Sequence, residues 1–175
     1  MRFLEIVGAV SASFSRPDAG SAERPRVLLA DDHEAVLART AEALTVECLV
    51  VGKVRDGYEL LAEAERLHPD VIVLDITMPR LNGIEAARQL RQLPRPARLV
   101  FLTVHEDADY ARAALDAGGL GYVVKARLAS DLLPAIRAAL ANRRFISPTV
   151  CLDEATPASP DLPAKPTPKD KKPKP

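Results

Sequence analysis

Short apolar runs alternate with amphipathic segments along most of the chain, starting at residue 26. The apolar runs predict five strands, at residues 27–30, 49–54, 71–74, 99–103 and 121–124. The segments between and after them predict five helices, at residues 34–46, 57–67, 84–93, 108–117 and 129–142. Strands that read as nearly continuous Val, Leu and Ile are typical of a parallel sheet covered by helices on both faces. The alternation therefore predicts an α/β domain built from β-α-β units.

The connections between these strands leave few topologies open. Crossovers between parallel strands are right-handed almost without exception. The flavodoxin-like order 2-1-3-4-5 satisfies this rule for a doubly wound (βα)5 parallel sheet, and it places strands 1 and 3 side by side. The sequence therefore predicts this fold, with its binding edge centred on the ends of strands 1 and 3.

Side chains suited to phosphoryl chemistry follow or end the predicted strands. They are Asp31, Asp32, Asp75, Thr103 and Lys125. Because ligands bind beyond the carboxyl ends of parallel strands, we expect these side chains to meet at one edge of the sheet. Three carboxylates, a hydroxyl and an ammonium define a site for Mg2+ and a transferable phosphoryl group. Asp75 is the candidate acceptor, since a carboxylate at a strand end can attack phosphorus in line and form an acyl phosphate.

More ordinary roles exist for the same residues. A single Asp before a loop is often a cap or turn residue, and Lys125 could form a static salt bridge with the acidic cluster. Other phosphate sites are disfavoured, because no P-loop is present and Asp-Asp-His-Glu stands where a dinucleotide fold would carry glycines.

Composition limits what surrounds this domain. The chain of 175 residues is long enough for one domain at 26–148 with extensions. We expect residues 1–25 to be poorly ordered and the Pro- and Lys-rich residues 149–175 to be a disordered tail. Basic and acidic residues balance at 24 each, so charge favours neither nucleic acid nor a membrane surface. Two cysteines and the lack of a long apolar run predict a cytoplasmic protein with no membrane span.

Over residues 26–148 the motifs resemble the receiver domain of bacterial two-component response regulators, which has a CheY-like fold. The matching motifs are Asp31-Asp32, Asp75 followed by Met78-Pro79 and Asn82-Gly83, Thr103, and Gly121-Tyr122-Val123-Val124-Lys125. Residues 102–107 and 144–148 are most similar to the NarL/FixJ subfamily. The resemblance implies that Asp75 accepts a phosphoryl group from a sensor histidine kinase.

The resemblance also implies a metal site at the acidic cluster. Mg2+, or Mn2+ in its place, would bind directly to Asp32 and Asp75. Asp31 would help through water, and the backbone carbonyl of Thr77 would complete the protein ligands. Hard oxygen ligands of this kind suit Mg2+, whereas ligation by the neighbouring His33 is disfavoured.

The same resemblance assigns a switch to Thr103 and Tyr122. Lys125 and Thr103 would contact the phosphoryl oxygens, and movement of the loop after Thr103 would vacate space beneath Tyr122. In relatives the residue matching Tyr122 changes rotamer with that movement. A simple core tyrosine is the alternative for Tyr122, and His105 is expected to line the site entrance.

The output of such a switch would pass through another protein. Members of the subfamily usually continue into a helix-turn-helix domain, but nothing after Pro148 could supply its amphipathic helices, so direct DNA binding is disfavoured. Phosphorylation would instead act on an unknown partner through the face formed by helix 4, strand 5 and helix 5, which could also form a homodimer. Ala126 stands where many receivers carry proline after the lysine.

Alternative functions remain open at this stage. A phosphorylation-independent binding module, or pseudo-receiver, would have the same fold, and a single receiver could also act as a phosphate sink or relay. A haloacid dehalogenase-type phosphatase would need a second Asp two residues after Asp75, where Thr77 stands. The chain is thus expected to be a self-phosphorylating switch and not an enzyme that turns over an external substrate.

Overall fold

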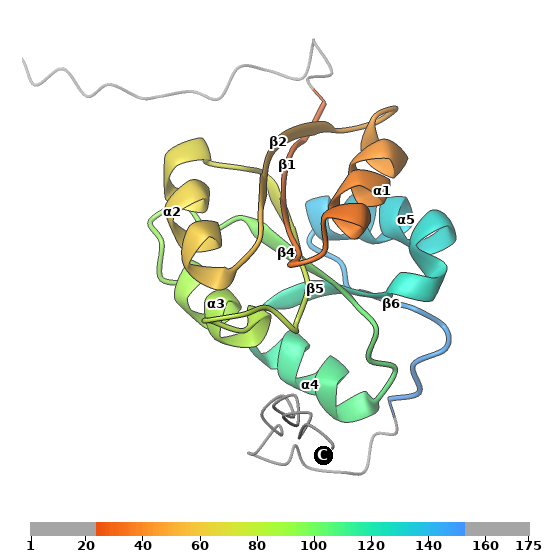
Figure 1. Ribbon diagram of the computed structural model, residues 1–175. Coiled ribbons are helices and arrows are strands. Elements are labelled where there is room, and N and C mark those ends of the chain that lie inside the picture. The colour runs from red at the N-terminus through yellow and green to blue at the C-terminus, as the bar shows by residue number, and fades with distance from the viewer. Residues whose placement is uncertain (1–23, 153–175) are drawn as a thin grey trace, which may run out of the picture.

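The computed structural model describes residues 24–152, which form one parallel sheet flanked by helices. The strands run in the order β2-β1-β3-β4-β5-β6 (Figure 1), so the predicted order 2-1-3-4-5 is confirmed. Their bounds are β1 (Arg26–Ala30), β2 (Leu49–Val54), β3 (Val71–Leu74), β4 (Arg98–Thr103), β5 (Gly119–Val124) and β6 (Phe145–Ile146). The predicted extension and tail lie almost entirely outside the described residues.

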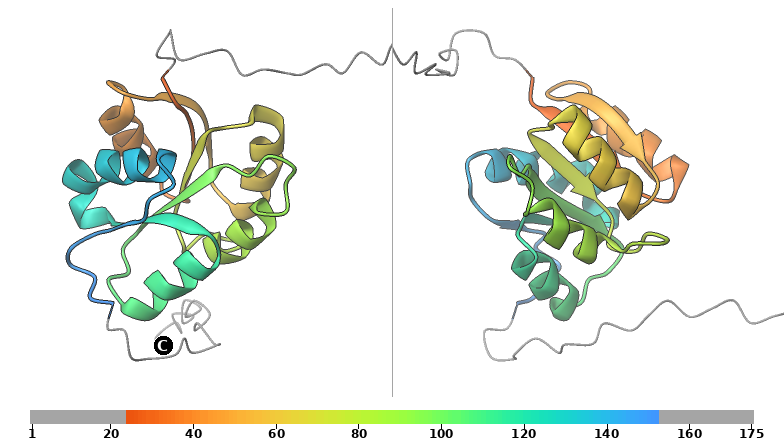
Figure 2. Two further views of the ribbon diagram at one scale, coloured as in Figure 1. Left: turned by 180° about the vertical axis from the view of Figure 1, so that it is seen from behind. Right: turned by 90° about the vertical axis from the view of Figure 1, so that its left-hand side faces the viewer.

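Helices cover both faces of the sheet, as Figures 1 and 2 show. One face carries α1 (Glu34–Leu44) and α5 (Leu128–Leu140). The other face carries α2 (Gly57–Leu67), α3 (Gly83–Leu90) and α4 (Ala108–Asp116). A short 3-10 helix, η1 (Lys125–Arg127), joins β5 directly to α5.

Residues of the central strands alternate between two apolar cores. In β1, Val27 and Leu29 belong to the core beneath α1 and α5, whereas Leu28 and Ala30 belong to the core beneath α2, α3 and α4. None of the four is more than 2% exposed. Burial on both faces explains why this strand reads as a continuous apolar run, and it fixes where the strand ends.

The start of α3 is packed directly against the end of β3. Asn82 caps the helix, since its side-chain oxygen accepts a hydrogen bond of 2.9 Å from the backbone N–H of Glu85. A Cβ atom on Gly83 would lie 2.0 Å from the backbone oxygen of Asp75. Glycine is therefore required at position 83, because any larger residue would displace the backbone that carries Asp75.

The sixth strand was not predicted. β6 adds parallel to β5, with Phe145 opposite Gly121 and Ile146 opposite Tyr122. Two residues are too short to give an alternating pattern, and Arg143 and Arg144 precede them, so the sequence offers no strand signal there. The sheet edge next to β5 is therefore covered by the chain's own segment.

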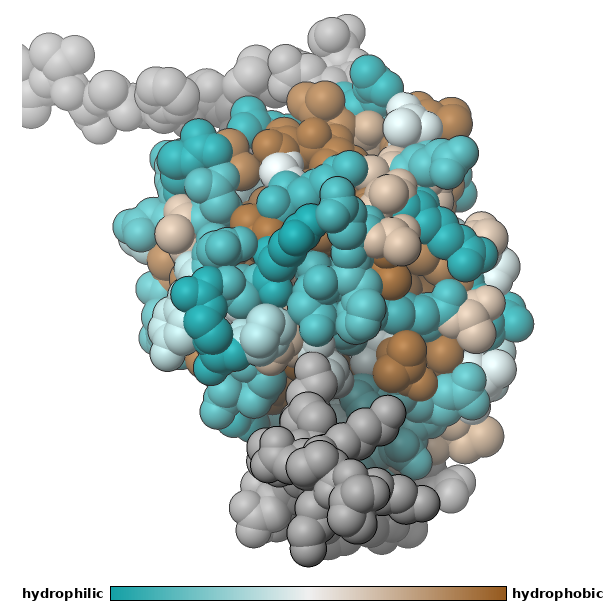
Figure 3. Space-filling view, viewed as in Figure 1, coloured by the Kyte–Doolittle hydropathy of each residue, from teal (hydrophilic) through white to brown (hydrophobic). Residues whose placement is uncertain are grey.

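The surface in the view of Figure 3 is largely hydrophilic, with small separate groups of hydrophobic side chains. The large apolar residues that are exposed include Val46, Leu49 and Val104. None of the described helices is long and apolar enough to cross a membrane. Cys48 is buried and Cys151 exposed, and both are free thiols.

Candidate functional site

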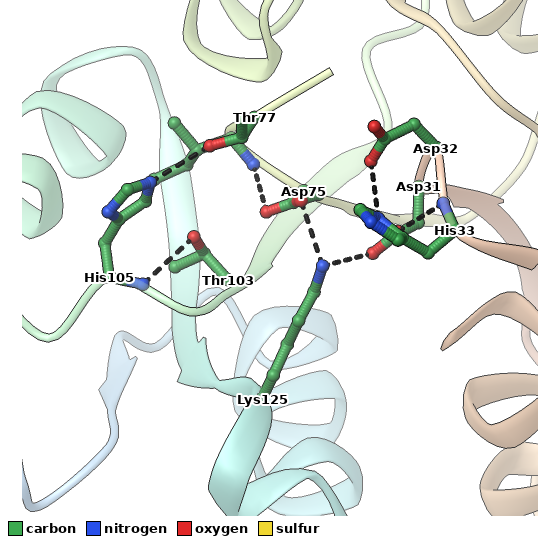
Figure 4. A network of polar contacts seen from close by, with 9 residues as sticks. Asp31, Asp32, His33, Asp75, Thr77, Thr103, His105 and Lys125 are labelled. Carbon is green, nitrogen blue, oxygen red and sulfur yellow. Dashed lines mark hydrogen bonds and ion pairs between the residues drawn. The ribbon is translucent and has the colours of Figure 1, made fainter. Parts of the chain in front are cut away.

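The ends of β1, β3 and β5 bring two aspartates and a lysine into direct contact (Figure 4). The ammonium nitrogen of Lys125 lies 2.6 Å from Oδ2 of Asp31 and 2.9 Å from Oδ2 of Asp75. Both carboxylates are buried, at 4% and 3% exposure. Strand pairing explains the contact, because β1 and β3 are neighbours and β5 delivers Lys125 from the same edge. The expected convergence of these three residues is therefore present.

Asp75 occupies a desolvated position with two hydrogen-bond donors. The backbone N–H of Ile76 donates to Oδ1 at 2.7 Å, and Lys125 donates to Oδ2. Burial raises the pKa of Asp75 above its ordinary value, and the charge of Asp31 raises it further. Lys125 and the Ile76 amide oppose this shift in pKa. The ionised form of Asp75 thus depends on nearby positive charge.

Lys125 provides that charge. Burial lowers its pKa, but the interactions with Asp31 and Asp75 outweigh burial, so the net pKa of Lys125 lies above its ordinary value. The ammonium is therefore held in its charged form between two carboxylates. A flexible point charge at this position can follow negative oxygen atoms as they arrive.

Asp32 turns toward His33 and away from Lys125. Nδ1 of His33 lies 2.8 Å from Oδ1 of Asp32 and 3.4 Å from Oδ1 of Asp31, whose oxygen also accepts from the His33 backbone N–H. Potential ligand atoms of Asp31, Asp32 and His33 all lie within 4.8 Å of one another. Among the described residues this acidic group does not include Asp75.

The donor set fits a hard divalent cation. Asp31 and Asp32 supply carboxylate oxygens, and Oδ2 of Asp31 is buried against the ammonium of Lys125. The negative charge of this oxygen is balanced by the Lys125 ammonium at 2.6 Å. Carboxylate oxygens are hard ligands of the kind that Mg2+ prefers.

His105 connects the remaining site residues. Its ring nitrogen Nε2 lies 3.0 Å from the hydroxyl of Thr77, and the ring stacks on Tyr110 of α4 with centroids 3.9 Å apart. Its backbone N–H donates to Oγ1 of Thr103 over 3.4 Å, a long and weak contact. Its backbone carbonyl accepts a hydrogen bond of 2.9 Å from the hydroxyl of Tyr122.

Thr103 and Tyr122 are both completely buried. Tyr122 therefore points inward, and burial raises the pKa of its hydroxyl far above the ordinary value. The hydroxyl acts only as a neutral donor to the His105 loop. Both roles weighed for Tyr122 are compatible with this position, because a core tyrosine tied to a site loop can also respond to that loop.

Comparison with known proteins identifies the family. A profile of the response regulator receiver domain matches residues 27–137. The chain belongs to this family. The receiver is 39% identical over 131 residues to the transcriptional regulatory protein PdtaR of Mycobacterium tuberculosis, covering 74% of this chain and 63% of PdtaR. It is 36% identical over 127 residues to the response regulator GacA of Pseudomonas viridiflava, covering 71% of this chain and 59% of GacA.

Solved structures agree on the fold of this receiver. A LuxR-family response regulator from Aurantimonas is 35% identical, with a TM-score of 0.70, covering 73% of this chain and 93% of that chain. The signal receiver domain of a NarL-type regulator from Mycobacterium tuberculosis is 28% identical, with a TM-score of 0.65, covering 69% and 99%. The chain spans about 60% of the length of the curated relatives, at 63% and 59%.

Sequence reasoning missed two partners within the receiver site. It gave His33 no role beside the metal ligands, although His33 pairs with Asp32. It placed His105 at the entrance without its contacts to Thr77, Tyr110 and Tyr122. The sequence carries no signal for these contacts, because they depend on side-chain rotamers, and those of His105 join it to a loop, to α4 and to β5.

Proposed function

We propose that this receiver accepts a phosphoryl group on Asp75 from a sensor histidine kinase and thereby switches a protein-interaction face. The supporting observation is the bridge that Lys125 forms between the buried carboxylates of Asp31 and Asp75. A buried aspartate whose charge depends on a mobile ammonium is suited to accept a phosphoryl group. A static turn residue would need neither the burial nor the lysine.

In the proposed transfer, an oxygen of Asp75 forms a bond to phosphorus as the bond to the donor histidine breaks. The bonding electron pair stays with the donor nitrogen, and the new acyl phosphate keeps its negative oxygens. Lys125 can then turn from the carboxylates to these oxygens. Thr103 can exchange its weak contact with the His105 amide for a hydrogen bond to the phosphoryl group.

Asp31, Asp32, Asp75 and the backbone carbonyl of Thr77 are the residues we assign to Mg2+, or to Mn2+ in its place. When bound, the ion would neutralise negative charge on the carboxylates and on the transferred group. Asp32 would have to release His33 to take part. Asp75 would share its oxygens between the ion and the incoming phosphorus.

The switch would start at Thr103 and reach Tyr122 through His105. If Thr103 moves toward a phosphoryl oxygen, the loop after it shifts, and the carbonyl that holds the Tyr122 hydroxyl shifts with it. Tyr122 lies in β5, between α4 and α5. A local charge event would thus alter the α4, β5 and α5 face, which we assign to a downstream protein partner or to a homodimer.

The setting we propose is the cytoplasm, where sensor kinases present their phosphohistidines and where the two free thiols would stay reduced. The described residues form a receiver and include no helix-turn-helix domain. We assign the chain a switching role and not turnover of an external substrate.

The test is intact mass after incubation with Mg2+ and acetyl phosphate. We expect one phosphoryl adduct on the wild-type protein, none on Asp75→Asn and none after addition of EDTA. Asp116→Asn, which changes an exposed aspartate at the end of α4, is the matched control and should be labelled like the wild type. If the wild type takes no adduct while a known receiver does, the proposed function is contradicted and phosphorylation-independent binding is the better-supported function.

A further inference from the structure

The chain folds back onto β5 after α5 and forms a strap, which we define as residues 145–152. β6 is its first part, and the backbone N–H of Ser147 extends the pairing by donating to the carbonyl of Tyr122 at 2.9 Å. The N–H of Val150 then donates to the Ser147 carbonyl at 3.0 Å. Figures 1 and 2 show the strap running from β6 toward the N-terminal end of α4.

A buried polar network holds the middle of the strap. The hydroxyl of Ser147 is completely buried, donates to Asp131 at 2.7 Å and accepts from the backbone N–H of Val124 at 3.2 Å. Asp131 also accepts hydrogen bonds from Arg127 at 2.8 and 3.1 Å and from Ser130 at 2.6 Å. Ser147 thus fastens the strap both to β5 and to α5.

Apolar packing holds the far end of the strap. Val150 is only 7% exposed and belongs to the same core as Ala111 and Ala114 of α4. Ile146 and Leu152 pack against this core as partly buried residues. The strap therefore pairs with the edge of β5 and packs into the core to which α4 also contributes, beside the face assigned to partner binding.

The phosphoryl site and the strap depend on the same short piece of β5 and η1. Tyr122 binds the His105 loop through its hydroxyl and the strap through its carbonyl. Val124 binds Ser147, and the next residue, Lys125, binds Asp31 and Asp75. Arg127, two residues later, binds the Asp131 that holds Ser147. A change at the site that moves this piece acts directly on the strap.

We propose that the strap is a release device: it is closed on β5 in the unphosphorylated receiver and opens when Asp75 is phosphorylated. This inference rests on the proposed function. Phosphorylation draws Lys125 and the His105 loop toward the phosphoryl oxygens. This movement shifts Tyr122 and Val124 and weakens their hydrogen bonds to Ser147. Opening uncovers the β5 edge and the apolar core beneath Val150, so the strap competes with any protein that binds there.

The experiment is hydrogen exchange of the full chain, measured with and without Mg2+ and acetyl phosphate, with intact mass taken from each sample. On phosphorylation we expect the amides of Val124, Ser147 and Val150 to exchange at least roughly tenfold faster, while α2 is unchanged. In Asp75→Asn the strap should stay closed under both conditions. A missing adduct would overturn the proposed function together with the strap. A full adduct with unchanged exchange would overturn the strap alone.

Three variants distinguish opening of the strap from general loosening of the fold. Ser147→Ala removes both hydroxyl contacts and should exchange faster at Val150 before phosphorylation, while still taking the adduct. Thr149→Ala, which alters an exposed strap residue, should behave like the wild type. Val150→Thr keeps the shape of the side chain but places a hydroxyl in the apolar contact, so it should also loosen the strap. It replaces Ser147→Ala if that variant does not fold. If the Val150 amide exchanges equally fast in Ser147→Ala, Val150→Thr and Thr149→Ala, the proposed strap is contradicted.

Discussion

The buried hydroxyl of Tyr122 donates a hydrogen bond of 2.9 Å to the backbone carbonyl of His105. This bond joins the middle of β5 to the loop that follows Thr103. It satisfies the hydroxyl of a tyrosine that is completely buried. Because Tyr122 also accepts from Ser147 through its carbonyl, one residue connects the site loop to the strap.

Tyr122→Phe should lower the free energy of unfolding by about 1–2 kcal/mol, since it removes the donor and leaves the His105 carbonyl unsatisfied. Urea denaturation at neutral pH measures this. Tyr58→Phe is the matched control, because Tyr58 is 55% exposed and its change should stay within about 0.5 kcal/mol. Equal losses in the two variants would show that the His105 bond contributes nothing specific.

The sequence predicted the strands and the contact between Asp31, Asp75 and Lys125 for one physical reason. Strands buried on both faces leave a strong apolar signal, and parallel strands end at a common edge, so residues after them must meet. Locating the strands and placing their ends at one edge can both be done without knowledge of side-chain packing. Pairing of β1 with β3 then brings Asp31 and Asp75 together.

The sequence could not predict contacts that depend on loop geometry. The pairing of His33 with Asp32 and the position of His105 depend on rotamers and turns that have no periodic signal. The strap was missed because its strand has two residues and its anchor is the small polar residue Ser147. The predicted helix ends also differed, since the helix expected at 84–93 ends at Leu90.

Gly83→Ala should displace Asp75, because the added Cβ would lie 2.0 Å from the Asp75 backbone oxygen. We expect a loss of roughly 1–3 kcal/mol in the free energy of unfolding and labelling by acetyl phosphate at least roughly tenfold slower. Gly52→Ala is the control, since its Cβ would meet only the ends of the Leu28 and Leu67 side chains at 2.9 Å. The hypothesis fails if both variants are labelled at the wild-type rate.

Asp131→Asn should remove a pH-dependent part of stability. The hydrogen bond from Arg127 holds the pKa of Asp131 at about 2, below its ordinary value of 3.8, with burial opposing and Ser130 and Ser147 assisting. A lowered folded-state pKa means that this stability is present above pH 3.8 and is lost as the pH falls toward about 2.

Urea denaturation of wild type and Asp131→Asn at several pH values between 7 and 3 tests this. The difference in unfolding free energy should be about 1–2 kcal/mol at pH 7 and should shrink as the solution becomes more acidic. Asp116→Asn should show no such trend. A difference that stays constant down to pH 3 would mean that Asp131 acts through its shape and not through its charge.

Lys125→Met should tighten Mg2+ binding while it impairs phosphorylation. In the wild type the ammonium of Lys125 neutralises Asp31 and Asp75, so it competes electrostatically with a divalent cation for the same carboxylates. Without it the two buried charges face each other uncompensated, and folding without metal should weaken by roughly 3–5 kcal/mol.

Titration calorimetry should then show Mg2+ affinity roughly tenfold higher in Lys125→Met than in the wild type, a change of about 1.4 kcal/mol. The increase in thermal midpoint on adding Mg2+ should also be larger in the variant, because the cation replaces a missing positive charge. Lys53→Met changes an exposed lysine on β2 and should leave both quantities unchanged. Weaker Mg2+ binding in Lys125→Met would mean that the lysine organises the carboxylates for the metal instead of competing with it.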